Sequence, residues 1–265
     1  MLCYPQLESG AIGQFPGRKR LVQRTVVNSL SDGSTWRSGD PAGSRIEWTL
    51  TYEDLTDTEM AAITTLFQTC EGRLRTFTFL DPTANLLGWS ESLSADAWRK
   101  DPLLELTSGI ADPLGTNRAT RITNTGQAAQ RLDQSLAALE NLQYCFSLYV
   151  RSDYTGEIIT YRTRSGTGDR RTFTIGPSWK RLVISSKLDS SSETATFGLE
   201  LPNGRTMDVF GLQVEAQPGA SQYKTNAGRG GVYTEARFID DSLTVTSQGL
   251  NRHSCRVRVT ARQGN

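Results

Sequence analysis

Few residues in this 265-residue chain have the types and spacing that catalysis or metal binding requires. The only histidine, His253, lies next to Ser254, but a nucleophile and its base also need a positioned acid, which neighbouring positions do not supply. The four cysteines lie far apart and form no CxxC motif, at Cys3, Cys70, Cys145 and Cys255. We therefore expect no catalytic residue, no metal and no cofactor, and we expect the cysteines to be small buried side chains.

Composition narrows the classes of function further. Lys and Arg number 29 and Asp and Glu 28, so the net charge is +1 and the basic excess typical of nucleic-acid binders is absent. No apolar stretch reaches the roughly 18–20 residues of a membrane span, and the first residues lack the pattern of a signal peptide. We expect a protein without nucleic-acid binding or a membrane span, kept in the cytosol until assembly or lysis.

The elements that would position any site begin in residues 1–86. Apolar and polar residues alternate between Arg45 and Tyr52, which predicts a strand with one buried face. Thr56 and Glu59 have the spacing of a capping box and predict the start of a helix that ends near Gly72. The apolar stripe of this helix includes Met60, Ile63 and Phe67.

Residues 87–227 have a different character, with short β-type runs separated by turn signals. Eight strands in about 140 residues predict an antiparallel β-sandwich or jelly roll. The predicted strands are 103–107, 118–123, 142–151, 157–164, 171–175, 179–186, 195–201 and 207–215.

Residues 226–231 are rich in glycine and are expected to be a flexible link. Strict alternation then returns near the C-terminus, in a segment too short for a core of its own. We therefore expect a mainly β protein in two domains. Residues 1–86 and 228–265 would form a discontinuous scaffold β-sandwich or barrel with one α-helix, interrupted by an inserted antiparallel jelly-roll β-sandwich at 87–227.

The outer segments have a recognisable order of strands and one helix. A basic strand start at residues 18–20 is followed by the alternating strand, the helix, and an aromatic strand that ends in Phe79-Leu80-Asp81-Pro82. The last strand has the sequence Arg-Val-Arg-Val-Thr-Ala. This order is similar to the distal-tail and minor-tail proteins of bacteriophages, including the gene-transfer-agent type. The resemblance implies a homo-oligomeric ring between the tail tube and the tail hub or tip proteins.

The central segment has four landmarks in order, at residues 85–100, 144–151, 179–181 and 210–223. In this order they resemble the carbohydrate-binding jelly rolls that occur in phage tail proteins and glycoside hydrolases. It implies a saccharide-binding fold. Tyr149, Arg151, Arg162 and Gln213 are the candidates for a shared, exposed binding face, because an aromatic ring and planar polar groups suit a sugar. The tryptophans at 89, 98 and 179 are expected in the core.

These expectations lead to a structural role in the virion tail tip, assembled in the host cytoplasm. The ring would display its insert toward a host cell-surface saccharide, and repetition around the ring would raise avidity. Two alternatives stay open at this point. The insert could be a tail-associated glycan hydrolase or esterase, or it could be a spacer without a ligand. Carboxylates are frequent enough that some pair will lie at glycosidase spacing by chance. Their number therefore does not decide whether the insert is a hydrolase.

Overall fold

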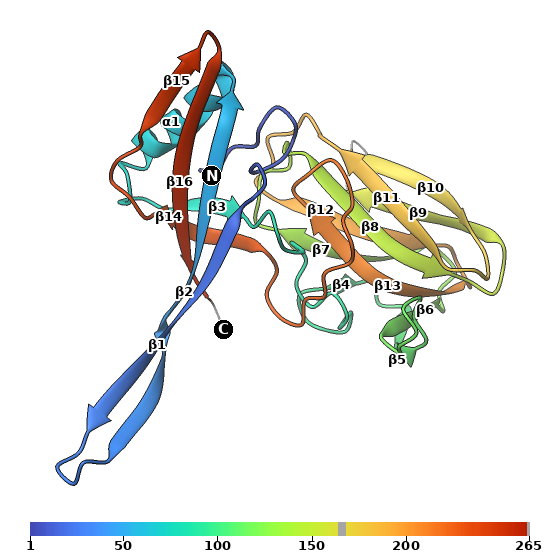
Figure 1. The fold of residues 1–265 in the computed structure, drawn as a ribbon. Coiled ribbons are helices and arrows are strands. Elements are labelled where there is room, and N and C mark those ends of the chain that lie inside the picture. Colours follow the sequence, from blue (N-terminus) through green and yellow to red (C-terminus); the bar gives the residue numbers. More distant parts are fainter. Residues whose placement is uncertain (164–167, 264–265) are drawn as a thin grey trace. The chain divides into compact units, whose positions relative to one another are not determined.

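The computed structural model describes residues 1–163 and 168–263, and it divides the chain into two compact units (Figure 1). The described residues form three largely antiparallel sheets and one helix, so the predicted mainly β fold class is confirmed. The scaffold unit contains Leu2–Leu7, Gly13–Phe79 and Tyr233–Asn265, and the sandwich unit contains Met1, Glu8–Ile12 and Leu80–Val232. Both sequence-based boundaries fall inside the sandwich unit, and the roles assigned to the two domains stay predictions.

The scaffold sheet combines strands from both ends of the sequence. Its strands are β1 (Arg18–Ser29), β2 (Thr35–Leu55), β3 (Phe77–Leu80), β14 (Val232–Phe238), β15 (Val245–Gly249) and β16 (Arg252–Arg262). Their order is β1-β2-β16-β14-β3, and β15 pairs with β16. Val257 lies opposite Leu50 and Val259 opposite Trp48, and all four are buried. The apolar faces of the two alternating segments therefore share one core.

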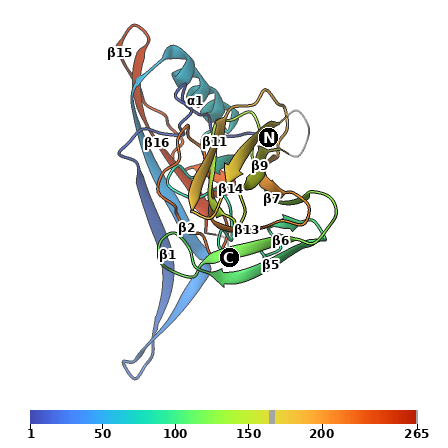
Figure 2. The same ribbon diagram turned by 90° about the vertical axis from the view of Figure 1, so that its right-hand side faces the viewer.

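The helix α1 (Asp57–Thr69) lies against β2 and β16 (Figure 2). Its predicted capping box is present: the Glu59 amide donates to Thr56 Oγ1 at 3.2 Å, and the Thr56 amide donates to Glu59 Oε2 at 3.0 Å. The helix buries Met60, Ile63 and Leu66. It stops before Gly72, whose φ of +63° is a conformation that side chains other than glycine rarely adopt.

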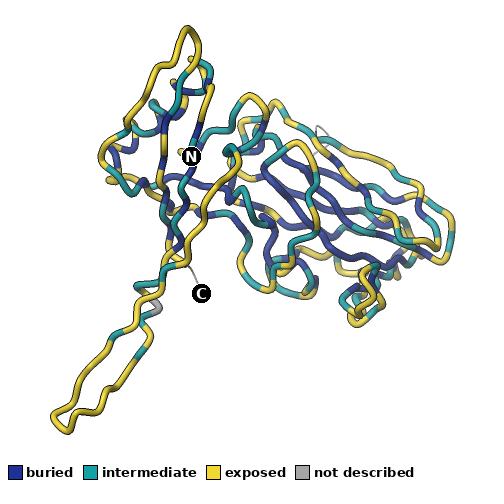
Figure 3. The backbone as a smooth tube through the Cα atoms, viewed as in Figure 1, coloured by how far each residue is buried: buried dark blue, intermediate teal, exposed yellow. Residues whose placement is uncertain are grey.

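The hairpin of β1 and β2 extends beyond the rest of its sheet. β16 accompanies β2 only as far as the pair Arg45–Arg262, and past that point β1 and β2 pair with each other alone. We call residues 24–40 the arm. Figure 3 shows that the arm is exposed along nearly its whole length. Val27, Leu30 and Trp36 are 51%, 55% and 57% exposed, so the arm has apolar side chains but no core.

The sandwich unit packs two five-stranded sheets face to face. Its strands are β4 (Arg99–Lys100), β5 (Leu104–Ile110), β6 (Ala119–Asn124), β7 (Gln130–Leu136), β8 (Tyr144–Arg151), β9 (Gly156–Arg162), β10 (Asp169–Ile175), β11 (Lys180–Ser186), β12 (Ala195–Leu201) and β13 (Thr206–Glu215). The sheet orders are β10-β9-β12-β7-β4 and β11-β8-β13-β6-β5. Phe146 of one sheet meets Phe197 of the other at 5.9 Å between ring centroids. All eight predicted strands are present, although residue 164 lies outside the described residues, and β4 and β7 are additional.

The first and last residues of the sandwich unit lie side by side. The Asp81 amide donates to the Gly231 carbonyl at 2.8 Å, and the Trp89 amide donates to the Gly228 carbonyl at 2.8 Å. Gly230 packs so closely that an added β-carbon would lie 1.9 Å from the Leu86 oxygen. The expectation of a flexible link at residues 226–231 is therefore wrong. The glycines there permit close backbone packing instead of mobility.

Candidate saccharide-binding face

The outer face of the β8 sheet contains two of the four predicted site residues. On β8, Phe146, Leu148 and Val150 point into the core, as predicted, and each is at most 1% exposed. Tyr149 and Arg151 alternate with them and are half-buried on the opposite side of the sheet. We call this side the outer face.

Tyr149 lies in a stack of planar groups on the outer face. Arg181 is opposite Tyr149 in the pairing of β11 with β8, and its guanidinium lies 5.3 Å from the centre of the Tyr149 ring. Arg181 also donates to the Ser221 carbonyl at 2.6 Å. On the next strand, Gly211 has a φ of +65°, and an added β-carbon would lie 3.3 Å from Tyr149. These contacts fix the orientation of the tyrosine and leave part of its ring exposed.

Arg151 belongs to a charged group beside this stack. Its Nε donates to Asp208 at 2.9 Å, and Arg121 Nε donates to the same carboxylate at 2.8 Å. The hydrogen bond from Arg121 to Asp208 raises the pKa of Arg121. The Arg151 guanidinium also lies 4.8 Å from the ring of Trp179, which is half-buried. The group therefore combines an aromatic surface with two arginines on one carboxylate, an arrangement able to donate hydrogen bonds to hydroxyl or carboxylate oxygens.

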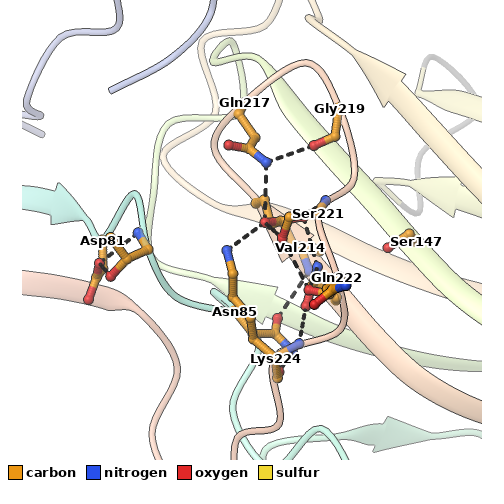
Figure 4. A network of polar contacts seen from close by, with 12 residues as sticks. Asp81, Asn85, Ser147, Val214, Gln217, Gly219, Ser221, Gln222 and Lys224 are labelled. Atoms are coloured by element: carbon orange, nitrogen blue, oxygen red, sulfur yellow. Dashed lines mark hydrogen bonds and ion pairs between the residues drawn. The ribbon is translucent and has the colours of Figure 1, made fainter. Parts of the chain in front are cut away.

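Gln213 lies on the same sheet but is covered, so its predicted exposure is wrong. Its side chain is 0% exposed. The Lys224 amide donates to Gln213 Oε1 at 2.7 Å, and Gln213 Nε2 donates to the Gln222 carbonyl at 3.3 Å. The cause is the segment after β13, which folds back over this part of the sheet (Figure 4). Gln213 anchors that segment and is not available to a ligand.

Glu215 holds the same returning segment. It accepts hydrogen bonds from the Ser221 amide at 2.9 Å and from Lys224 Nζ at 2.8 Å (Figure 4). Burial alone would raise the pKa of Glu215, but the hydrogen bonds from Lys224 and Ser221 lower it overall. Asn85 adds a third anchor, since its Oδ1 accepts from the Val214 amide at 3.1 Å. The network ties β13 to both ends of the sandwich unit.

Arg162 is in the core of the sandwich, so its prediction as an exposed site residue is also wrong. It belongs to β9 in the other sheet, lies opposite Phe197 and is 0% exposed. Its guanidinium lies 4.8 Å from the ring of Tyr144, and its Nη2 donates to the Leu142 carbonyl at 2.8 Å and to the Glu140 carbonyl. Burial lowers the pKa of Arg162 to about 10. The residue satisfies loop carbonyls that have no strand partner.

The other sheet has a polar outer face that the sequence did not reveal. Tyr161 Oη donates to Asp133 Oδ2 at 2.6 Å across Gly198, where an added β-carbon would lie 2.8 Å from the tyrosine oxygen. Arg99 Nε donates to Asp133 Oδ1 at 3.0 Å. Tyr161 and Asp133 are 1% and 0% exposed, so this group supports the sheet and does not present a binding surface.

Two tryptophans are also placed differently from expectation. Trp98 is 5% exposed and lies in the core as predicted. Trp89 is 38% exposed, and Trp179 is half-buried beneath Arg151. The two-residue spacing of Trp179 and Arg181 is the signal that could have revealed this position, because residues two apart on an extended segment point to the same side.

Two further properties of the described residues bear on function. In residues 1–163 and 168–263, no helix has the length and apolar character needed to cross a membrane. Across the same ranges, no group of three or more His, Cys, Asp or Glu side chains is arranged to hold a metal ion. Cys70, Cys145 and Cys255 are buried and free, and burial raises the pKa of Cys145 and of Cys255 to about 11.

Comparison with known proteins gives similarity in structure only. No protein-family model matches the chain, and no curated protein matches it. A xylan-binding domain of carbohydrate-binding module family 22 is 14% identical, with a TM-score of 0.42 over 53% of this chain and 100% of that one. The C-terminal family 22 module of Clostridium thermocellum Xyn10B is 17% identical, with a TM-score of 0.40 over 54% of this chain and 98% of that one.

A phage protein is among the similar structures. The enzymatically active domain of tailspike protein 4 from bacteriophage CBA120 is 11% identical, with a TM-score of 0.39. The match covers 52% of this chain and 22% of the tailspike chain, so this chain spans about a fifth of that structure.

Proposed function

We propose that this chain is a structural protein of a phage-type tail tip. Its scaffold unit self-associates into a ring between the tail tube and the hub or tip proteins. Its sandwich unit binds a host-surface saccharide without hydrolysing it.

The arm is the observation that carries this proposal. A two-stranded ribbon is marginally stable in water unless another surface covers it. Neighbouring positions of a strand point to opposite faces, so Val27 lies on one face of the arm and Val26 and Trp36 lie on the other. Both faces therefore have an apolar side chain that no part of the described chain covers. An exposed apolar surface of this kind is typical of a protein interface.

A second copy of the chain is the partner that we propose for the arm. An arm that docks on a different surface of the next subunit makes a heterologous contact, and such contacts form a ring where the rotation between neighbours closes. The free edges of the arm can also add to an edge strand of that neighbour through backbone hydrogen bonds. The next subunit then buries the apolar side chains of the arm, and the arm does not need to pair with another arm.

The saccharide role of the sandwich unit is supported by its outer face. Tyr149 and Arg151 lie there together with Trp179, which supplies the aromatic and planar polar groups that sugars need. Asp208 accepts hydrogen bonds from two arginines and is not free to act as a general base. These contacts favour binding over hydrolysis.

The self-association proposal is tested by light scattering of the full-length chain. The wild type is expected to be oligomeric, and Trp36→Ser is expected to shift it toward the monomer. Leu250→Ser is the matched control, because Leu250 is 98% exposed in the same unit but lies outside the arm. A monomeric wild type, or equal effects of the two substitutions, would contradict the ring.

A further inference from the structure

The face of the scaffold sheet opposite its core is unusually rich in arginine. Along β16, every second residue from Cys255 to Ala261 is buried, and the residues between and after them are exposed arginines, except for the half-buried Thr260. The pairing register brings residues of β1, β2 and β14 to the same side. We call this side the open face. Its charged residues are Arg18, Arg20, Arg45, Glu47, Glu53, Glu235, Arg237, Arg256, Arg258 and Arg262.

Only part of this charge is compensated on the open face. Glu47 pairs with Arg45 at 2.8 Å and lies 3.7 Å from Arg20. Arg258 pairs with Asp240. Among the described residues, Arg18, Arg256 and Arg262 have no carboxylate within ion-pair distance. Seven arginines therefore lie beside four carboxylates, Glu47, Glu53, Glu235 and Asp240, whereas the whole chain has a net charge of only +1.

Two hollows lie among these arginines. The first has a volume of about 350 Å³ and is lined by Arg18 and Arg256 with Thr49 and Thr51 between them. The second, of about 620 Å³, is lined by three arginines, two threonines, an alanine and one glutamate: Arg45, Arg237, Arg262, Thr76, Thr260, Ala261 and Glu235. Each hollow places guanidinium groups beside threonine hydroxyls, so it offers several hydrogen-bond donors to a carboxylate.

We propose that the open face binds an acidic surface of a partner protein. Arginine pairs with carboxylates through two parallel hydrogen bonds, and residues two apart on a strand are spaced by roughly 6.6–6.8 Å. The face therefore presents regularly spaced guanidinium groups that can form paired hydrogen bonds with the carboxylates of aspartate and glutamate.

The composition of the face favours a protein over a nucleic acid or a membrane. All its cations are arginines, and Thr49, Thr51 and Thr260 lie among them together with a few glutamates. Protein interfaces are enriched in arginine and depleted in lysine, whereas phosphate binding in general uses both. The proposal is independent of self-association, because the open face lies along the paired part of the sheet and not on residues 24–40.

The full-length protein is tested with poly-L-glutamate, with single-stranded oligothymidylate of equal charge, and with vesicles containing phosphatidylglycerol. Arg256→Glu/Arg262→Glu is the informative variant, because neither arginine forms an ion pair with a carboxylate of residues 1–163 or 168–263. Arg171→Glu/Lys187→Glu is the control, since it changes the net charge equally at exposed positions of the sandwich unit. Thermal melting of each variant checks that it is folded.

We expect poly-L-glutamate to bind at 0.15 M salt, and the open-face variant to bind it at least tenfold more weakly. The control should bind within twofold of the wild type. Absent binding, or equal loss in both variants, overturns the proposal. Tighter binding of oligothymidylate or vesicles through the same arginines also overturns it, in favour of a nucleic acid or a membrane.

Discussion

Gly230 approaches the backbone of Leu86 so closely that a β-carbon at residue 230 would lie 1.9 Å from the Leu86 carbonyl oxygen. This contact closes the sandwich unit where the chain enters and leaves it. Gly228, two residues earlier, has nothing within 4 Å of the same added atom. The two glycines therefore form a matched pair for testing the junction.

We predict that Gly230→Ala destabilises the sandwich unit by about 1–3 kcal/mol, because the backbone must move to accept the methyl group. Gly228→Ala should change the free energy of unfolding by less than about 0.5 kcal/mol. Urea denaturation of both variants measures the difference. Equal stability of the two variants would show that the junction is not packed as described.

The scaffold unit should fold without the segment that interrupts it. The Asp81 amide and the Gly231 carbonyl are hydrogen-bonded at 2.8 Å, so a short Gly-Ser linker can replace residues 82–230. Ile12 is best changed to Ser in this variant, because it belongs to the sandwich unit and is buried there. We expect a soluble protein with one cooperative thermal transition, measured by calorimetry. An unfolded product would argue against a discontinuous domain.

Arg162 should support stability and not binding. Arg162→Ala leaves the carbonyls of Glu140 and Leu142 without their donor and removes packing against Tyr144. We expect a loss of about 3–5 kcal/mol in the free energy of unfolding. The Arg171 side chain is 59% exposed, so Arg171→Ala should change the free energy of unfolding by less than about 0.5 kcal/mol. A stable Arg162→Ala variant would contradict the structural role.

Much of the fold follows from local patterns in the sequence. The alternation around Trp48 and Leu50 predicted β2, and the capping box at Thr56 predicted α1. β7 (Gln130–Leu136) was missed because it buries polar residues. Its Asp133 is stable there only because Tyr161 and Arg99 bond to it, and neither partner is near it in sequence.

The candidate site could be predicted only in part. Alternation along β8 placed Tyr149 and Arg151 on the outer face correctly. Alternation also placed Gln213 on that side, but it does not reveal that residues 221–224 return to cover it. For Arg162, alternation leaves two possible sides, and the sheet to which β9 belongs decides between core and surface. The burial of Gln213 and Arg162 depends on contacts between segments far apart in the sequence, which a local pattern does not contain.

Saccharide binding should depend on Tyr149 and Arg151. Displayed in multiple copies, the full-length chain is expected to bind host-envelope glycans on an array, with an affinity per site on the order of millimolar to micromolar. Tyr149→Ala and Arg151→Ala should each weaken binding at least tenfold. The loss of Arg151 should affect stability little, because Arg121 still pairs with Asp208. Arg171→Ala serves as the control on the other sheet.

Two results would contradict this account of the sandwich unit. If no glycan binds even in multivalent form, the unit is a spacer. If glycan fragments accumulate in the supernatant, the unit is a hydrolase. Measurement of released reducing ends separates these outcomes from simple binding.

Electron microscopy of the purified full-length protein, compared with an arm-shortened variant, tests the central claim most directly. In that variant, Asn-Gly replaces residues 25–39 and joins Arg24 to Asp40, which are already paired in the hairpin. We predict closed rings for the wild type and single subunits for the shortened variant. Single subunits for the wild type, or rings that persist without the arm, would contradict the account.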